Sequence, residues 1–260
     1  MLIQITYSLI FASAIMFVVW LIQYKTNNAG FVDVSWAFCT ALIGIYFAFM
    51  NTDSLVLRNF IAAIMIGLWG FRLGYFLLRR VLNENEDRRY HYMREHCGKY
   101  AQLVMFLFFQ LQATWAVLFA LTILAVVNNK NVNLQITDYV AIIIWCVSLA
   151  GEYLADWQLS QFRKSNNSSK VCKIGLWRYS RHPNYFFEWL HWWTYIFLSL
   201  ASPLWWLSWL IMFIVLIFLV KITGIPYTEQ NALRTKGDAY REYQRTTSAF
   251  LLLPPKKSSS

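Results

Sequence analysis

The segment that decides the fold of this 260-residue chain is Gly175-Leu-Trp-Arg-Tyr-Ser-Arg-His-Pro-Asn-Tyr-Phe-Phe-Glu-Trp-Leu-His-Trp-Trp193. Its basic half ends at Pro183, whose fixed φ and missing N–H suit the first turn of a helix. The residues that follow are apolar and aromatic up to Leu200 and include one carboxylate, Glu188. The pattern predicts a membrane helix that begins near Asn184, with its positive dipole end facing the basic side chains.

The basic cluster has two interpretations. Arg178 and Arg181 suit the ordinary positive flank of a membrane helix. The free amides of a helix N-terminus also suit an anion such as phosphate. Asn184 and Glu188 favour a functional site, because they lie four residues apart on one helical face. Polar groups inside a membrane helix are costly and usually functional.

The rest of the chain also suits lipid. Hydrophobic residues make up 58% of it, against ~45–50% in a soluble domain. The pattern predicts an all-α membrane protein with one domain over residues 1–255 and a disordered tail over 256–260. Stretches long enough to cross about 30 Å of hydrocarbon predict seven helices. The expected spans are Leu2–Ile22, Phe31–Met50, Asn59–Leu78, Leu103–Val127, Tyr139–Leu159, Tyr185–Leu200 and Leu204–Val220.

The basic residues orient these spans. With seven helices, all 23 lysines and arginines except Arg58, Arg72 and Lys130 lie on the side of the C-terminal tail or in loops that share it. The positive-inside rule then places the N-terminus outside and the tail in the cytoplasm. The net charge of +10 is therefore topological, and no nucleic-acid motif accompanies it. The spacing of the four cysteines and four histidines predicts no metal site.

Two ionisable residues lie within the early spans. Asp33 follows the start of the second span, where a carboxylate either caps free amides or acts as a proton donor after desolvation. Arg72 lies in the third span, where it either pairs with an acid or a phosphate or extends to the membrane surface. In the same span Gly70 and Gly74 form a small-xxx-small pattern that predicts close helix packing. The segment from Asn83 to Lys99 is expected to be a solvated loop.

The polar candidates gather on one side of the membrane. Glu152, Asp156 and Arg163 share one helical stripe, and two carboxylates in the last turns of a helix need donors. A pocket of mixed charge there suits a large anionic cofactor from the cytosol, with arginines for phosphates and carboxylates for ribose hydroxyls. The candidate residues are Arg72, Arg79, Asp87, Arg89, Glu152, Asp156, Arg163, Tyr179, Arg181, His182, Asn184, Tyr185, Glu188 and Tyr240.

These motifs resemble the steroid 5α-reductase superfamily, and in particular its uncharacterised bacterial branch. The similar parts are Gly175 to Phe186, the acidic stripe after Gly151, the segment Asp33 to Trp36, and Glu86-Asp-Arg-Arg-Tyr90. The resemblance implies a monomeric enzyme of the bacterial inner membrane that binds NADPH from the cytoplasm. It would reduce the carbon–carbon double bond of a lipophilic enone such as a 3-oxo-Δ4 steroid.

The resemblance also assigns roles by position. Glu152, Asp156, Arg163, Lys170, Asn184 and Glu188 match cofactor-pocket positions, and Arg72 matches an arginine that approaches phosphate. Asp33 matches the acid that hydrogen-bonds the substrate ketone, a role that requires it to be protonated. The chain departs from the steroid-reducing members at two positions. Trp69 stands where they carry a tyrosine that pairs with this acid, and Phe187 replaces a glycine.

Two other functions remain open. Arg181-His-Pro-Asn-Tyr185 also resembles the Arg-His-Pro-x-Tyr motif of isoprenylcysteine and phospholipid methyltransferases, which use S-adenosylmethionine. Glu229 and the tail tyrosines are similar to the tail of those enzymes, although the usual second glutamate is missing. A transporter or receptor is the third alternative, and it would require a polar path across several helices.

Overall fold

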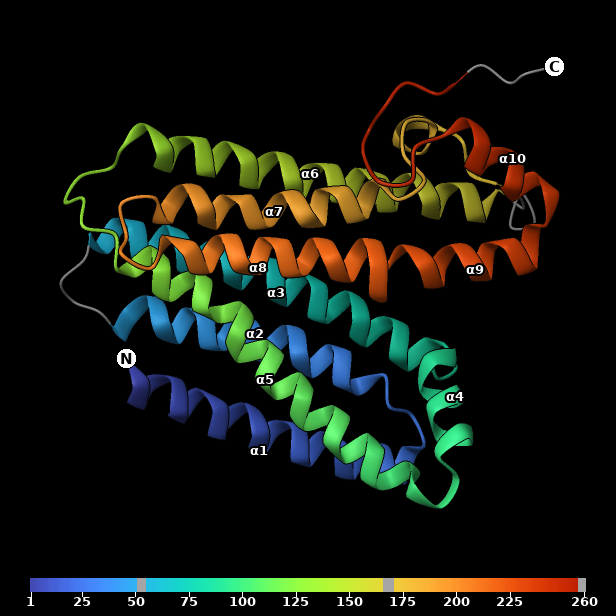
Figure 1. Ribbon diagram of the computed structural model, residues 1–260, viewed down its shortest axis with the longest axis horizontal. Helices are drawn as coiled ribbons and strands as arrows, with labels where there is room; N and C mark the ends of the chain where they lie inside the picture. The colour runs from blue at the N-terminus through green and yellow to red at the C-terminus, as the bar shows by residue number, and fades with distance from the viewer. Residues whose placement is uncertain (51–54, 166–170, 257–260) are drawn as a thin grey trace. The chain divides into compact units, whose positions relative to one another are not determined.

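The structure, a computed structural model, describes residues 1–50, 55–165 and 171–256. This part of the chain is helical and contains no strand, apart from an isolated bridge between Ser180 and Ser248, so the all-α prediction is confirmed. Figure 1 shows the order of the helices. They are α1 (Leu2–Thr26), α2 (Phe31–Met50), α3 (Val56–Asn83), α4 (Arg88–Cys97), η1 (Gly98–Tyr100), α5 (Ala101–Val127), α6 (Ile136–Lys164), η2 (Gly175–Arg178), α7 (Pro183–Ser199), α8 (Trp205–Ile217), η3 (Phe218–Ile222), α9 (Ile225–Lys236) and α10 (Asp238–Thr246).

Six helical stretches in the described part of the chain are long and apolar enough to cross a membrane, as expected of a multi-pass membrane protein. The expected sixth span corresponds to α7, which has 17 residues and lies at the lower limit of the ~17–25 that crossing requires. The six stretches are Leu2–Thr26, Phe31–Met50, Val56–Asn83, Arg88–Val127, Ile136–Lys164 and Trp205–Lys236.

The segment from Asn83 to Lys99 is not the solvated loop that the sequence suggested, because it contains α4. Asp87 caps this helix by accepting a hydrogen bond of 3.0 Å from the backbone N–H of Arg89. Four of the ten residues of α4 are charged and two are histidines, so no apolar periodicity marks the helix in the sequence. Tyr90, which is 3% exposed, is the one buried residue of α4.

Contacts within the chain define two compact units. Unit 1 comprises Met1–Leu134 and Leu198–Leu207, and therefore contains α1 to α5. In it α2 packs against both α3 and α5, and α1 packs against α5 and α2 (Figure 1). Unit 2 comprises Gln135–Phe197 and Ser208–Ser260, and contains α6, α9, α10 and most of α7 and α8.

Small residues allow the close approach of α2 and α3 in unit 1, as the glycine pattern predicted. A Cβ atom on Gly70 would lie 2.6 Å from the Cβ of Ala41, so no larger residue fits between the two helices. Beside this contact the Trp69 ring lies 6.0 Å from that of Trp36 in an edge-to-face arrangement. Trp69 is fully buried and therefore serves the core of unit 1.

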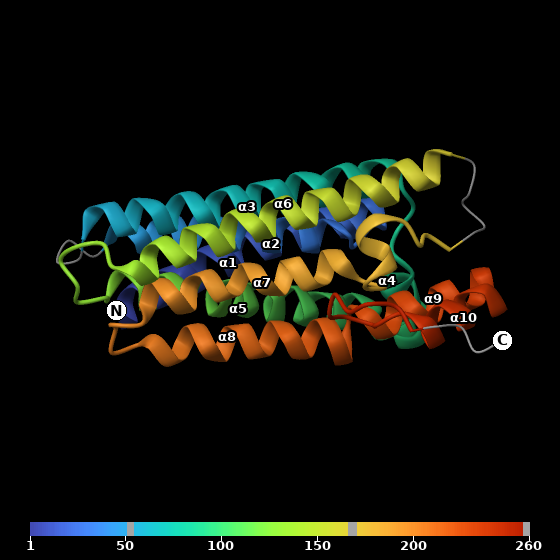
Figure 2. The ribbon, with the colours of Figure 1, turned by 90° about the horizontal axis from the view of Figure 1, so that it is seen from above.

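In unit 2, α6, α7 and α8 run side by side, as Figures 1 and 2 both show. A Cβ atom on Gly151 of α6 would lie 2.3 Å from the ring of Phe187, so the missing side chain makes room for this ring on α7. The α7–α8 hairpin turns around Ser202-Pro203, and Trp193 packs on Trp209 with 5.7 Å between ring centroids.

The chain after α8 folds back onto the segment that opens α7. Gly224 is the N-cap of α9, and Pro226 lies in the first turn of this helix. The Ser180 hydroxyl donates to the carbonyl of Phe250 at 2.8 Å, and Tyr243 donates to the carbonyls of Trp177 and Ser180. These bonds fix the C-terminal segment beside η2. Of the residues 256–260 predicted to be disordered, only Lys256 lies in the described part, and its backbone N–H donates to the carbonyl of Thr246 at 2.8 Å.

Candidate functional site

The predicted site residues form two groups, one in each unit. Lys170 is in neither group, because it lies outside the described residues. Unit 1 holds Asp33, Arg72, Arg79, Asp87 and Arg89. Unit 2 holds Glu152, Asp156, Arg163, Tyr179, Arg181, His182, Asn184, Tyr185, Glu188 and Tyr240.

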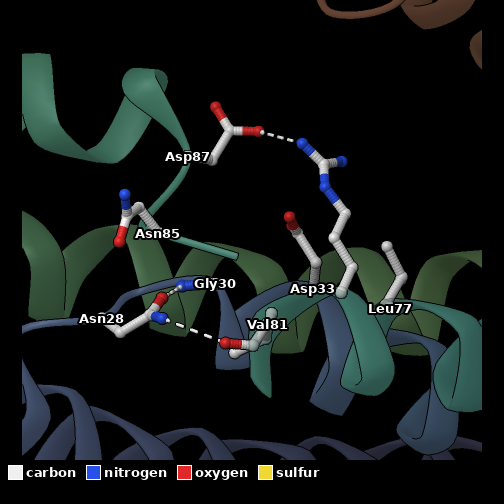
Figure 3. A pocket seen from close by; sticks show the side chains of 8 residues that line it. Asn28, Gly30, Asp33, Leu77, Val81, Asn85 and Asp87 are labelled. Carbon is white, nitrogen blue, oxygen red and sulfur yellow. Dashed lines mark hydrogen bonds and ion pairs between the residues drawn. The ribbon is translucent and has the colours of Figure 1, made fainter. Parts of the chain in front are cut away.

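Asp33 in the first turn of α2 is paired with a tyrosine. The Tyr90 hydroxyl of α4 donates a hydrogen bond of 2.7 Å to Asp33 Oδ1, and Arg89 lies 3.5 Å from Oδ2. The carboxyl group therefore joins α2 to α4. Figure 3 shows it projecting from α2 beside Leu77 and Val81 of α3.

A neighbouring carboxylate holds Arg89 in place. Asp87 accepts hydrogen bonds from Arg89 Nε at 3.1 Å and from Arg80 at 3.3 Å. Burial alone raises the pKa of Asp87, but its hydrogen bonds with Arg89 and the positive charges of Arg89 and Arg80 outweigh burial and hold this pKa below its ordinary value. Asp87 thus remains ionised at neutral pH and positions Arg89 against Asp33.

A small cavity opens beside this group. Its volume is about 20 Å³, which is room for one water molecule. Asn28 and Gly30 lie on one side, and Figure 3 shows Asp87 across from Asp33. The Asn28 amide donates to the carbonyl of Val81 at 3.5 Å and its oxygen accepts the N–H of Gly30 at 3.0 Å, so the turn before α2 is fixed to α3. The cavity gives a small polar group access to the Asp33 carboxyl.

The two other candidates in unit 1 lie on α3. Arg72 is half-buried within this helix, and Arg79 is exposed with its guanidinium 6.0 Å from the ring of Tyr75. The phosphate role of both arginines stays a prediction.

Tyr90 is a candidate residue that the sequence did not reveal. The reductase resemblance places a tyrosine on the third span, where Trp69 stands, but the hydroxyl that meets Asp33 comes from α4. The signal was the segment Glu86-Asp-Arg-Arg-Tyr90, the one aromatic residue among charges after an Asp that suits an N-cap.

In unit 2, the first turn of α7 meets the acidic stripe of α6. The Asn184 amide donates to Asp156 at 3.2 Å, while its oxygen accepts the N–H of Tyr185 at 3.0 Å. Glu152, one turn before Asp156, is buried. Glu188 lies one turn further along α7 and accepts a hydrogen bond of 3.4 Å from the indole of Trp192. The structure thus brings together the predicted pair Asp156 and Asn184, whereas Arg163 is exposed near the end of α6.

A second polar cluster joins the Arg181-His182 pair to the tail. One oxygen of Glu229, on α9, accepts a hydrogen bond of 2.6 Å from Arg181 Nε and lies 3.3 Å from the His182 ring. The other oxygen accepts a hydrogen bond of 2.8 Å from the Gln244 amide. The Tyr240 hydroxyl lies 3.5 Å from the same carboxylate. Burial lowers the pKa of His182 and outweighs the opposite effect of Glu229, so this ring is neutral at neutral pH. Both oxygens of Glu229 are therefore occupied by the protein itself.

Among the described residues, no group of three or more His, Cys, Asp or Glu side chains could hold a metal ion. Comparisons with known proteins add a family but no relative of known function. No curated protein matches the chain. No solved structure matches it either. The family described as "Protein of unknown function (DUF1295)" matches residues 19–247. This match extends from within α1 to the end of α10, so the chain belongs to the DUF1295 family.

Proposed function

We propose that this protein is a membrane reductase that uses NADPH to reduce the carbon–carbon double bond of a lipophilic enone. The observation that carries the proposal is the 2.7 Å hydrogen bond from Tyr90 to Asp33. It supplies the acid and tyrosine pair that the reductase resemblance requires, although the tyrosine comes from α4 rather than α3. The association of DUF1295 with the steroid 5α-reductase-like superfamily supports the same class of reaction.

The pair suits the electronic demand of enone reduction. Negative charge develops on the ketone oxygen as the β-carbon is reduced, and an O–H donor held in advance stabilises that charge. The single proton of the Tyr90 hydroxyl points to Asp33 in this structure, and Arg89 orients Asp33. With an enone bound, this proton would turn to the ketone oxygen while a protonated Asp33 donates to the Tyr90 oxygen. The pair lies where α2 begins, at the end of an apolar helix, so an apolar substrate would reach it from the membrane.

The donor set of unit 2 fits a dinucleotide cofactor. A carboxylate and an amide in contact, Asp156 and Asn184, offer acceptors and donors for ribose hydroxyls and a carboxamide. Glu152 and Glu188 extend this polar surface along α6 and α7. When bound, NADPH supplies the hydride for the β-carbon. The role of the protein is then to bind the cofactor, to exclude water and to polarise the ketone.

The topology follows the same proposal. We infer that α7 is a seventh span, that the N-terminus lies outside and that the tail lies in the cytoplasm of a bacterial inner membrane. The positive-inside pattern of the lysines and arginines supports this orientation. It gives the cofactor site access to cytosolic NADPH.

A methyltransferase that uses S-adenosylmethionine is the second candidate. The observation that favours it is the contact of Glu229 with Arg181 and His182, which gathers the residues of the Arg-His-Pro-x-Tyr motif and its tail. Arg181 Nη1 also donates to the carbonyls of Gln244 and Thr247. These groups satisfy one another and leave few donors for a ligand, so the cluster serves better as a structural latch for the tail.

Thermal unfolding of the detergent-purified protein with NADPH, NADH and S-adenosylmethionine tests the two candidates. A ligand that binds only the folded state raises the unfolding temperature in a saturable way. We expect this shift with NADPH and its loss in Asp156→Ala and Asn184→Ala. Asp238→Ala, an exposed carboxylate on α10, is the matched control. A shift with S-adenosylmethionine alone would overturn the reductase and support the methyltransferase.

A further inference from the structure

The C-terminal segment after α10 forms one wall of a cleft in unit 2. Leu253 donates its backbone N–H to the carbonyl of Tyr179 at 3.1 Å, and Lys256 donates its own to the carbonyl of Thr246 at 2.8 Å. These bonds hold the segment beside η2 and the end of α10, as the red and gold ribbons in Figure 1 show. The cleft has a volume of about 560 Å³.

Three basic side chains from three parts of the sequence line this cleft. Lys173 precedes η2, Arg178 ends it and Lys256 lies in the C-terminal segment. Glu242 also lines the cleft, but its carboxylate pairs with Arg245 at 2.9 Å. Like charges that converge in one cleft repel one another, and a bound anion removes this repulsion. The lining therefore selects for a phosphate or a similar anion.

Exposed apolar side chains lie close in sequence to residues that line the cleft. Ile174, Leu251 and Leu253 are 48%, 46% and 49% exposed. Ile174 follows Lys173, and both leucines lie shortly before Lys256 in the C-terminal segment. Large exposed apolar residues beside lysines and arginines are typical of a surface that meets lipid headgroups.

An aromatic contact places this surface beside the start of α7. Phe250 packs on Phe186 and Trp189, with 5.9 and 5.6 Å between ring centroids. Both partners lie in the first two turns of α7, where the sequence changes from basic to apolar. With α7 as the seventh span proposed above, the C-terminal segment would lie where the headgroup region of a membrane meets its hydrocarbon.

We propose that this cleft binds the phosphate of an anionic phospholipid, with Ile174, Leu251 and Leu253 against the acyl chains. Lys173, Arg178 and Lys256 would hold the phosphate. A soluble nucleotide phosphate is also an anion, but it leaves the three apolar side chains without a role, so the lipid is the better ligand. The site shares no residue with the Tyr90–Asp33 pair, and it rests on the topology proposed above but not on the reductase chemistry.

Titration of the detergent-purified protein with dioctanoyl phosphatidylglycerol, dioctanoyl phosphatidylcholine and adenosine 2′,5′-bisphosphate tests the site by thermal unfolding. The cleft variant is Lys173→Gln/Arg178→Gln/Lys256→Gln. Its matched control removes two exposed lysines and one exposed arginine elsewhere, as Lys25→Gln/Lys221→Gln/Arg234→Gln. Circular dichroism and gel filtration establish that both variants fold.

We expect saturable stabilisation by phosphatidylglycerol that is roughly a hundredfold weaker in the cleft variant and unchanged in the control. Leu251→Ser/Leu253→Ser should weaken binding of the lipid while leaving that of the bisphosphate unchanged. Equal affinity of cleft and control variants for phosphatidylglycerol would overturn the proposal. Cleft-dependent binding of the bisphosphate without binding of the lipid would also overturn it, because the phosphate would then belong to a soluble ligand.

Discussion

The Tyr90 hydroxyl donates a 2.7 Å hydrogen bond to Asp33 Oδ1, although the two residues lie on different helices and 57 positions apart in the chain. This bond joins a carboxylate at the start of α2 to a hydroxyl from α4. Arg89, held by Asp87, contacts the second oxygen of Asp33. The pair therefore has a defined orientation.

Removal of the Tyr90 hydroxyl should lower turnover more than cofactor binding. In Tyr90→Phe we expect kcat for an enone to fall by roughly 10²–10³, the usual cost of one donor to a developing oxyanion. The dissociation constant of NADPH should remain within about twofold. Tyr92→Phe is the matched control, because this residue lies on the same helix with its ring 65% exposed. Equal turnover of Tyr90→Phe and the control would exclude Tyr90 from the chemistry.

Loss of Glu229 should destabilise the attachment of the tail. Arg181 is 9% and Glu229 14% exposed as side chains, so Glu229→Ala leaves a buried guanidinium without its carboxylate. Breaking such a pair from one side costs about 3–5 kcal/mol. We expect a lower unfolding temperature and faster proteolysis after α9. Glu242→Ala breaks the exposed pair with Arg245 and should cost under about 1 kcal/mol. Similar stabilities of the two variants would refute the latch.

Stability should fall as the pH is lowered through the ordinary pKa of histidine. Burial lowers the pKa of His182 below its reference value of 6.5 in the folded state. Below pH 6.5 the unfolded chain binds a proton that the folded chain rejects, so the free energy of unfolding decreases until the folded pKa is reached. We expect His182→Gln to flatten the dependence of the unfolding temperature between pH 7.5 and 5.5. His91→Gln, an exposed histidine, should leave the slope unchanged. An unaltered slope in His182→Gln would contradict the assignment.

A side chain at Gly175 should be tolerated worse than one at Gly98. Both glycines have positive φ, +53° and +48°, so alanine meets a similar backbone strain of about 1–2 kcal/mol at each. Only at Gly175 does the new Cβ meet a neighbour, because the Gln158 amide lies 2.2 Å away. That amide also accepts the N–H of Leu176 at 2.9 Å. We expect chemical denaturation to show a larger loss for Gly175→Ala. Equal losses would mean that the turn before η2 adapts.

The sequence by itself determined the helical class, the apolar spans and the ends of several helices. The length of an apolar stretch determines whether it can span a membrane, and Pro183 and Gly224 mark helix ends through their own backbone chemistry. Neither effect needs a tertiary contact. The acidic stripe and Asn184 were also visible, because residues four apart share a helical face.

Only the tertiary structure decided which polar groups meet. Tyr90 was hidden because α4 is a charged helix held by a cap and one buried ring, which leaves no apolar period to detect. Trp69 packs in the core of unit 1, and the tyrosine that hydrogen-bonds Asp33 comes from α4. The hydrogen-bond donors of Arg181 are occupied by groups that lie 48 to 66 residues later in the chain. No local sequence pattern encodes a pairing over that distance. Hydrogen bonds between distant segments depend on how the helices pack, and the sequence specifies that packing only through the complete set of side-chain contacts.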